Sequence, residues 1–102
     1  MKLPQVREED KHSIEDSVKL HGIEAQCDML VEECAELIVA LQKLKRKRGK
    51  TTEEKIKDVQ DELADVFLMS NQGAYMFGVD AVQERINFKM ERLVIRNNEK
   101  IQ

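Results

Sequence analysis

The sequence predicts an all-α fold, a hairpin of two long helices with flanking helices, completed into a four-helix-bundle-like core by oligomerisation. Apolar residues recur at helical spacing along two long stretches of the chain. Charged residues make up 36% of the composition and aromatic residues only 4%, which disfavours strands. A chain of 102 residues also buries only a modest core, so association with further copies supplements it naturally.

The N-terminal part of the chain is predicted to hold one short helix. Residues 1–12 are polar, and we expect them to be loosely ordered. A helix is predicted over 13–20, because a capping serine is followed three positions later by Asp16. The pair His21-Gly22 ends this helix or bends the chain into the next one.

The first long helix is predicted over 23–47, with Cys34 at the centre of its apolar stripe. The basic run KLKRKRGK ends it, because Gly49 suits a helix C-terminus and the cations before it complement the helix dipole. The positions predicted to face inward are Ile23, Cys27, Leu30, Val31, Cys34, Leu37, Ile38, Leu41 and Leu44.

The second long helix is predicted over 52–77, with Leu63 at the centre of its apolar stripe. Thr51 and Glu54 form a capping box at its start, and Gly78 ends it. The positions predicted to face inward are Ile56, Val59, Leu63, Val66, Phe67, Ser70, Ala74 and Phe77.

A last helix is predicted over 81–96, opened by Asp80 and Gln83 in a second capping-box pattern. Residues 97–102 are expected to be loosely ordered. Since no linker or low-complexity segment interrupts the chain, residues 1–102 are expected to form a single domain.

Two segments, EECAELIVAL and DELADVFLMS, repeat one pattern of acidic and apolar residues. On helical wheels at about 100° per residue, Glu33 and Glu62 lie at the same angle from their stripe centres. Glu36 and Asp65 also share an angle, on the same side. A short connection makes the two helices antiparallel neighbours, so both acid pairs are predicted to converge at one edge of the helix contact.

Four converging carboxylates repel strongly unless they are protonated or neutralised. A hard divalent cation neutralises them most simply, and oxygen ligands suit Mg²⁺ or Mn²⁺. The alternative is that both pairs belong to ordinary solvated helix faces, but two matched copies beside apolar stripes favour the metal site. The outer acids Glu32 and Asp61 are predicted to point away from it.

The last predicted helix carries a basic ridge, which consists of Arg85, Lys89, Arg92 and Arg96. Spacings of four, three and four place these residues on one side of the helix. Beside a metal–carboxylate site, such a ridge would clamp a polyphosphate. Alternatively, it is a solvated face whose cations pair with acidic neighbours.

Net charge and hydropathy argue against two classes of partner. The formal charge of −3 argues against a nucleic-acid binder, and no apolar run approaches the roughly 20 residues that span a bilayer. The first residues lack the apolar region of a secretory signal. Cys27 and Cys34, two helical turns apart, are too far apart for a disulfide and fit a reducing compartment. A cytoplasmic location is therefore expected.

The motif Glu33-Cys34-Ala35-Glu36, followed by Glu62-Leu63-Ala64-Asp65 and by Lys89 and Arg96, resembles the all-α nucleoside triphosphate pyrophosphohydrolases of the MazG type. The resemblance covers residues 23–96 and implies a single MazG-like domain. It implies that the four motif acids bind Mg²⁺ and that the two cations contact phosphates. It also implies a homodimer or homotetramer whose sites use residues of adjacent subunits. Leu93 stands where a common family pattern has Asn.

The reaction implied by the resemblance is hydrolysis of a (deoxy)nucleoside triphosphate to the monophosphate and pyrophosphate, in nucleotide-pool cleansing. Glu32 and Glu33 are both candidates for the carboxylate that accepts the proton of the attacking water. Gln26 lies on the same side of its helix as Glu33, where it could read a base edge or serve as an ordinary polar flank.

An interpretation from another class remains open on the residues alone. The chain would then be a non-catalytic helical interaction protein that binds an acidic partner or nucleic acid through its basic ridge. Metal binding separates the two interpretations, because the second treats the motif acids as ordinary solvated residues.

Overall fold

The computed structural model describes residues 1–101. These residues form one 3-10 turn and four α-helices, and no strand occurs among them. The all-α prediction is therefore confirmed. The elements are η1 (Glu8–Asp10), α1 (Lys11–His21), α2 (Ile23–Lys45), α3 (Thr52–Phe77) and α4 (Val79–Ile101).

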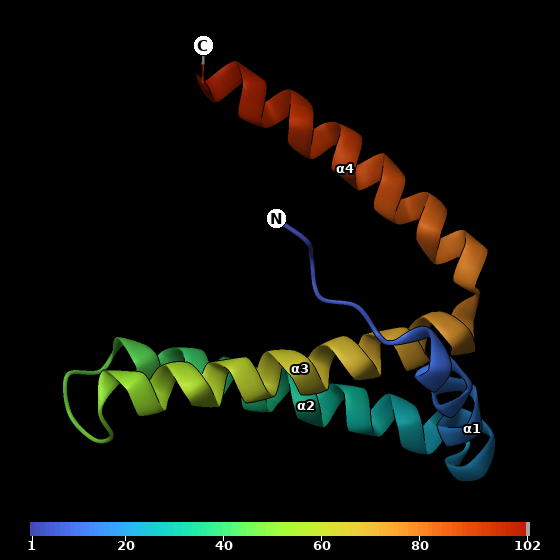
Figure 1. The fold of residues 1–102 in the computed structure, drawn as a ribbon, viewed down its shortest axis with the longest axis horizontal. Coiled ribbons are helices and arrows are strands. Elements are labelled where there is room, and N and C mark those ends of the chain that lie inside the picture. The colour runs from blue at the N-terminus through green and yellow to red at the C-terminus, as the bar shows by residue number, and fades with distance from the viewer. Residues whose placement is uncertain (102) are drawn as a thin grey trace.

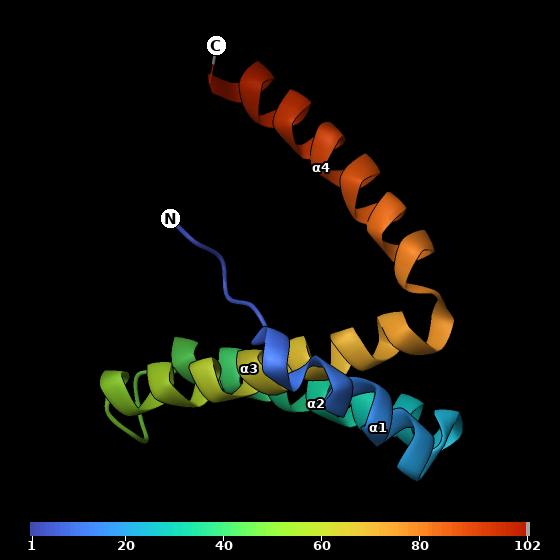
Figure 2. The ribbon, with the colours of Figure 1, turned by 45° about the vertical axis from the view of Figure 1, so that its right-hand side comes forward.

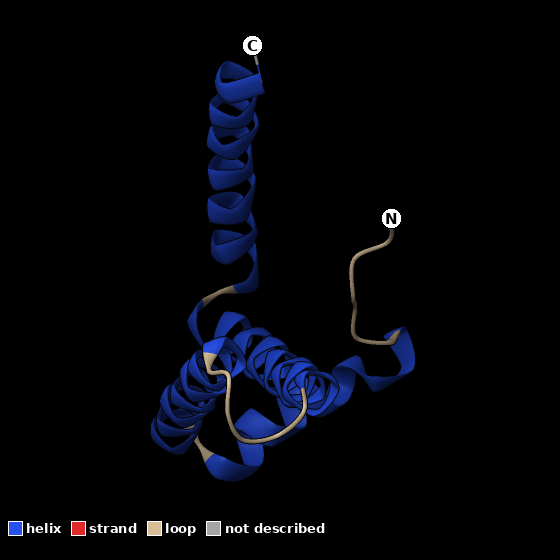
Figure 3. Cartoon of the chain, turned by 90° about the vertical axis from the view of Figure 1, so that its left-hand side faces the viewer, coloured by secondary structure: helices blue, strands red, loops and turns tan. Residues whose placement is uncertain are grey.

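Helices α2 and α3 lie side by side as an antiparallel hairpin, closed at one end by the loop that connects them (Figure 1). Helix α1 packs against both of them at the other end of the hairpin. Helix α4 projects away from the hairpin and, within residues 1–101, contacts no helix except α3 (Figures 2 and 3). The turn between α3 and α4 is made by Gly78 with φ +115, a conformation that favours glycine.

The capping box at the start of α3 is present as predicted. The Thr51 hydroxyl oxygen accepts a hydrogen bond from the Glu54 backbone N–H at 3.2 Å. The same hydroxyl donates to the Glu54 carboxylate at 3.0 Å. This reciprocal pair satisfies a free donor of the first helical turn and fixes where α3 begins.

The other two helix starts and the C-terminal end differ from the predictions. Ser13 and Asp80 lie inside helices rather than at their caps, because α1 begins at Lys11 and α4 begins directly after the Gly78 turn. The chain enters α1 through η1, so the helical conformation is already established before the serine. Helix α4 continues past the predicted end at residue 96 to Ile101, so much of the expected loose tail is helical.

The contact between α2 and α3 follows the seven-residue repeat of a coiled coil. On α2 it passes through Leu30, Leu37 and Leu44, which are half-buried. On α3 it passes through Val59 and Val66, which are also half-buried. The buried apolar side chains of residues 1–101 are few, so the core of one chain is small. They are Val18, Ala40 and Met69.

The predicted centres of the apolar stripes are wrong. Cys34 is exposed and 51% of Leu63 is exposed, so neither residue lies in the hairpin contact. The apolar face of each long helix is wider than one helix pair covers, and the hairpin uses only one flank of it. The other flank stays uncovered.

The uncovered apolar surface extends over the hairpin and along α4. The Cα radius of gyration is 16.5 Å, whereas a compact domain of this length has about 13 Å. The chain alone therefore does not build a four-helix bundle. Exposed large apolar side chains include Ile38, Leu63 and Phe67 on the hairpin, and Ile86, Met90 and Leu93 on α4. Among residues 1–101, no helix has the length and hydropathy needed to cross a membrane.

Candidate metal centre

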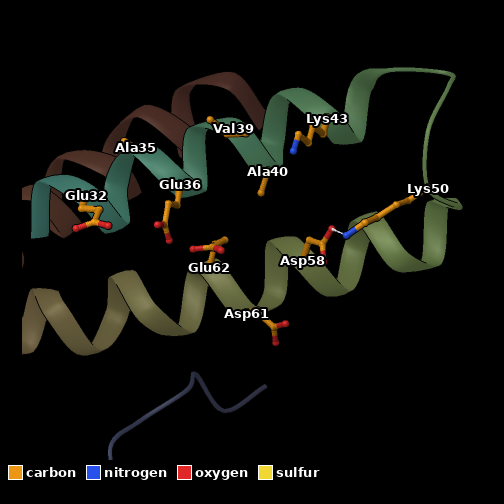
Figure 4. Close-up of a pocket in the computed structure, with 10 residues that line it drawn as sticks. All are labelled: Glu32, Ala35, Glu36, Val39, Ala40, Lys43, Lys50, Asp58, Asp61 and Glu62. Atoms are coloured by element: carbon orange, nitrogen blue, oxygen red, sulfur yellow. Dashed lines mark hydrogen bonds and ion pairs between the residues drawn. The ribbon is translucent and has the colours of Figure 1, made fainter. Parts of the chain in front are cut away.

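A single antiparallel register pairs the two acidic segments across the hairpin. The side-chain amide of Gln26 donates a hydrogen bond to Gln72 at one end of the contact. Moving seven residues along α2 and seven back along α3 leads to Glu33 and Asp65, which each offer a carboxylate oxygen within 4.8 Å of the other. Three residues further along α2 and three further back along α3 lie Glu36 and Glu62, which point toward each other (Figure 4). The two acidic segments therefore lie opposite each other in antiparallel order.

We define the carboxylate cluster as the three acids whose oxygens the structure brings together, Glu33, Glu62 and Asp65, with Glu36, which points toward Glu62 from α2. One carboxylate oxygen from each of Glu33, Glu62 and Asp65 lies within 4.8 Å of the others. Glu33 and Glu62 are half-buried, whereas Asp65 is exposed. The Oε2 atoms of Glu33 and Glu62 are buried and lack a hydrogen-bond partner among residues 1–101. Such oxygens are costly unless a cation or a proton satisfies them.

The electrostatics of the cluster favour uptake of positive charge. Burial raises the pKa of Glu33, and the negative charges of Glu36, Asp65 and Glu62 raise it further. The pKa of Glu62 is raised by burial first and then by the charges of Glu36 and Asp65. A divalent cation would remove both causes, because it neutralises the charges and gives the buried oxygens a ligand to bind.

Glu33 and Glu62 sit in the helix contact itself, whereas Glu36 and Asp65 are exposed beside it, although the wheels placed all four at its edge. Glu33 and Glu62 occupy coiled-coil core positions in line with Leu37 and Val66. Acids from the two segments nevertheless converge, as predicted. Both helices pack through the same flank of their apolar faces, so the two acidic segments stay opposite each other. The metal-binding role of these acids stays a prediction.

An open groove with a volume of about 470 Å³ runs along the hairpin beside the cluster. Glu36 on α2 and Glu62 on α3 point toward each other across it (Figure 4). Asp61 points away from α2, although it also lines the groove. Glu32, which was predicted to point away from the site, instead lines the groove one turn from Glu36.

A family model of the MazG nucleotide pyrophosphohydrolase domain matches residues 21–102. The chain belongs to this family. No curated protein and no solved structure gives a significant match. The match covers the hairpin with its carboxylate cluster as well as α4. The cluster thus lies within a domain type named for nucleotide pyrophosphohydrolysis, and its all-oxygen ligand set fits a hard divalent cation.

The basic ridge of this MazG domain does not reach the cluster within one chain. All four of its residues lie on the exposed part of α4, which projects away from the hairpin (Figure 1). The guanidinium carbon of Arg85 lies 4.7 Å from the centroid of the Phe88 ring, and that of Arg92 lies 5.9 Å from it. Lys89 and Arg96 are exposed. The ridge is therefore exposed and lies away from its own hairpin.

Gln26 is the site candidate whose position argues against its predicted role. It is 5% exposed and its amide is bonded to Gln72, so it is closed to a nucleobase. Its position in the core of the MazG hairpin indicates that it fixes the helix register. The alternative prediction, that Gln26 is an ordinary polar residue beside the apolar stripe, fits the structure better, although Gln26 is buried within the helix contact.

Polar residues at the loop end complete the groove, and two of them, Lys43 and Lys50, belong to the basic run KLKRKRGK. Lys43, Lys50 and Asp58 line its end nearest the loop, and Lys50 donates to Asp58 at 3.0 Å. Lys55 is buried close by, only 7% exposed. The signal for it was available, because Lys55 precedes Glu62 by seven residues and so occupies the same core line of α3.

Proposed function

We propose that this chain is a Mg²⁺-dependent nucleoside triphosphate pyrophosphohydrolase, which converts a (deoxy)nucleoside triphosphate into the monophosphate and pyrophosphate to cleanse the nucleotide pool. The observation that carries the proposal is the pair of buried carboxylate oxygens on Glu33 and Glu62 that lack a partner among residues 1–101. In a member of the MazG family, a divalent cation is the group that best satisfies them. The cytoplasmic location stays a prediction from the sequence.

In this proposal, the four acids of the carboxylate cluster hold the cation. Bound Mg²⁺, or Mn²⁺ in its place, supplies electrostatic stabilisation to the charge that develops on phosphate oxygens. In the reaction, water adds to a phosphorus of the bridge between the α- and β-phosphates, and the bridging P–O bond breaks. The products are the nucleoside monophosphate and pyrophosphate whichever of the two phosphorus atoms is attacked, so the product pair distinguishes this reaction from removal of a terminal phosphate.

The attacking water needs a carboxylate that accepts its proton. Glu32 lines the groove but is outside the carboxylate cluster, so its oxygens stay available for this task. Glu33, the other candidate, is occupied with the cation in this arrangement. We therefore assign the proton acceptor to Glu32.

A second copy of the chain completes the site in this proposal. The uncovered apolar residues of the hairpin and of α4 need a covering surface, and a homodimer or homotetramer supplies it. Lys89 and Arg96 would then contact phosphates bound at the cluster of a neighbouring copy. Leu93, 40% exposed and seven residues after Ile86, continues the apolar stripe of α4 and would belong to this interface.

Assay of a panel of ribo- and deoxynucleoside triphosphates with Mg²⁺ tests the proposal. Release of pyrophosphate together with the nucleoside monophosphate supports it. Absence of turnover across the panel, or release of orthophosphate alone, would contradict it. The competing interpretation, a non-catalytic helical interaction protein, predicts no turnover and no specific metal binding.

A further inference from the structure

A second pocket, with a volume of about 340 Å³, lies at the loop end of the hairpin. We call it the basic pocket. It is lined by Lys43, Arg46, Arg48, Lys50 and Lys55 together with Ala40, Gly49 and a single acid, Asp58. Five cations around one carboxylate give the pocket a strongly positive potential.

Lys55 fixes the shape of the basic pocket. Its Nζ donates hydrogen bonds to the backbone carbonyls of Arg46 at 2.5 Å and Arg48 at 2.9 Å. These bonds hold the loop against the first turn of α3. The ammonium group has a third donor, and no carboxylate among residues 1–101 lies within 4.0 Å of it. A buried cation without a counter-ion is costly, so an anion in this pocket would stabilise it.

The basic pocket opens onto the acidic groove. Ala40, Lys43, Lys50 and Asp58 line both of them. Lys43 points from α2 toward the groove, and Lys50 crosses its end to reach Asp58 (Figure 4). Lys43 follows Glu36 by two helical turns, or about 10 Å of helix, so the acids and the cations occupy neighbouring stretches of one channel.

We propose that the basic pocket binds the distal phosphates of the substrate and then the pyrophosphate product. The inference rests on the proposed function and adds a specificity determinant to it: a requirement for a γ-phosphate. Lys43 and Lys50 contact these phosphates at the border between the basic pocket and the acidic groove. There Lys50 releases Asp58 and donates to a phosphate oxygen instead. Charge-assisted bonds from these ammonium groups would favour a triphosphate over the corresponding diphosphate.

The first experiment is calorimetric titration of the full-length protein with inorganic pyrophosphate in the absence of metal. The variants are the double substitution Lys43→Gln with Lys50→Gln, and the double substitution Lys2→Gln with Lys57→Gln as a charge-matched control at exposed positions outside the basic pocket. We expect the double variant to bind pyrophosphate at least about tenfold more weakly than wild type, with the control unchanged. Equal affinity in all three proteins would overturn the proposal, as would binding of a single-stranded oligonucleotide through these lysines where pyrophosphate does not bind.

The second experiment compares kcat/KM for a nucleoside triphosphate and its diphosphate, with circular dichroism to verify folding. We expect the double variant to lose at least about tenfold on the triphosphate and little on the diphosphate. An equal loss on both would contradict the γ-phosphate requirement. If no nucleotide is turned over by wild type, the proposed function fails, whereas the pyrophosphate titration still decides whether the pocket binds phosphates.

Discussion

Glu33 on α2 and Glu62 on α3 meet at core positions of the helix contact, and each buries a carboxylate oxygen that lacks a hydrogen-bond partner among residues 1–101. Core positions of a helical hairpin are normally apolar, because ionised groups there lose hydration without compensation. The metal-free chain therefore carries a local cost to folding at the place where the proposed chemistry occurs. That cost is explained if the two acids fold around a cation.

Removal of any one acid of the carboxylate cluster should abolish most activity. We expect Glu33→Gln, Glu36→Gln, Glu62→Gln and Asp65→Asn each to lower turnover by at least about 100-fold, or about 2.7 kcal/mol of transition-state stabilisation. Asp61→Asn should change turnover little, because Asp61 points away from α2. Steady-state kinetics measures both effects. Equal damage from Asp61→Asn and Glu62→Gln, with both variants folded, would show that the acids are misplaced.

Glu32→Gln should separate proton transfer from metal binding. We expect turnover to fall by at least about 100-fold, the usual contribution of a general base. Metal affinity should stay close to that of wild type, since Glu32 lies outside the carboxylate cluster. Kinetics and a Mn²⁺ titration on the same sample provide the comparison. Parallel loss of both properties would instead make Glu32 a metal ligand.

The stability of the metal-free protein should decrease as pH rises above 4.5, the ordinary pKa of a glutamate. Glu33 and Glu62 have pKa values raised above 4.5 in the folded chain, so folding binds protons at these sites. Their ionisation, as pH passes from the unfolded to the folded pKa, therefore lowers the free energy of unfolding. Glu15 has the opposite shift, because Lys19 and Tyr75 lower its pKa, but its contribution is lost only as pH falls below 4.5.

Thermal melts in a chelating buffer measure this pH dependence. Glu62→Gln should melt at a higher temperature than wild type near pH 7 and should flatten the pH profile, because it removes one of the repelling charges. Saturating Mg²⁺ should reverse the order, since only the ionised wild-type cluster binds the cation fully. A melting temperature of wild type that is independent of both pH and Mg²⁺ would argue against the proposed electrostatics.

Sites shared between subunits should be revealed by mixing two inactive variants. Glu36→Gln lacks a cluster acid, and the double variant Lys89→Ala with Arg96→Ala lacks the phosphate contacts of α4. If each site combines the cluster of one copy with α4 of another, mixed oligomers contain some intact sites and partial activity returns. Activity after subunit exchange, with light scattering to verify oligomers, measures this. A mixture that stays inactive although exchange is complete would indicate sites built within one chain.

The hairpin and its matched acids could be predicted because both depend on local order in the sequence. Helical periodicity and the Thr51 capping box determine where α3 runs, and equal spacing of the acids lets both pairs meet in the one antiparallel register that also pairs Gln26 with Gln72. The packing flank could not be predicted in the same way. Wide apolar faces allow several contact lines, and the one adopted leaves Cys34 and Leu63 exposed.

Tertiary relations account for the remaining differences. Gln26 and Lys55 are polar residues at core positions, and only the fold shows that Gln72 and the loop carbonyls satisfy them. The direction of α4 after Gly78 is set by a backbone turn that no periodicity encodes. The basic ridge on α4 was therefore visible in the sequence, whereas its distance from the cluster within one chain was not.

Calorimetric titration of the metal-free protein with Mg²⁺, repeated with Mn²⁺, tests the central claim most directly. The account predicts saturable binding to wild type that is lost in Glu62→Gln. Binding should be retained in Glu53→Gln, which removes the same charge from an exposed position at the start of α3. The same absence of saturable binding in all three proteins would contradict the claim that the carboxylate cluster is a metal site.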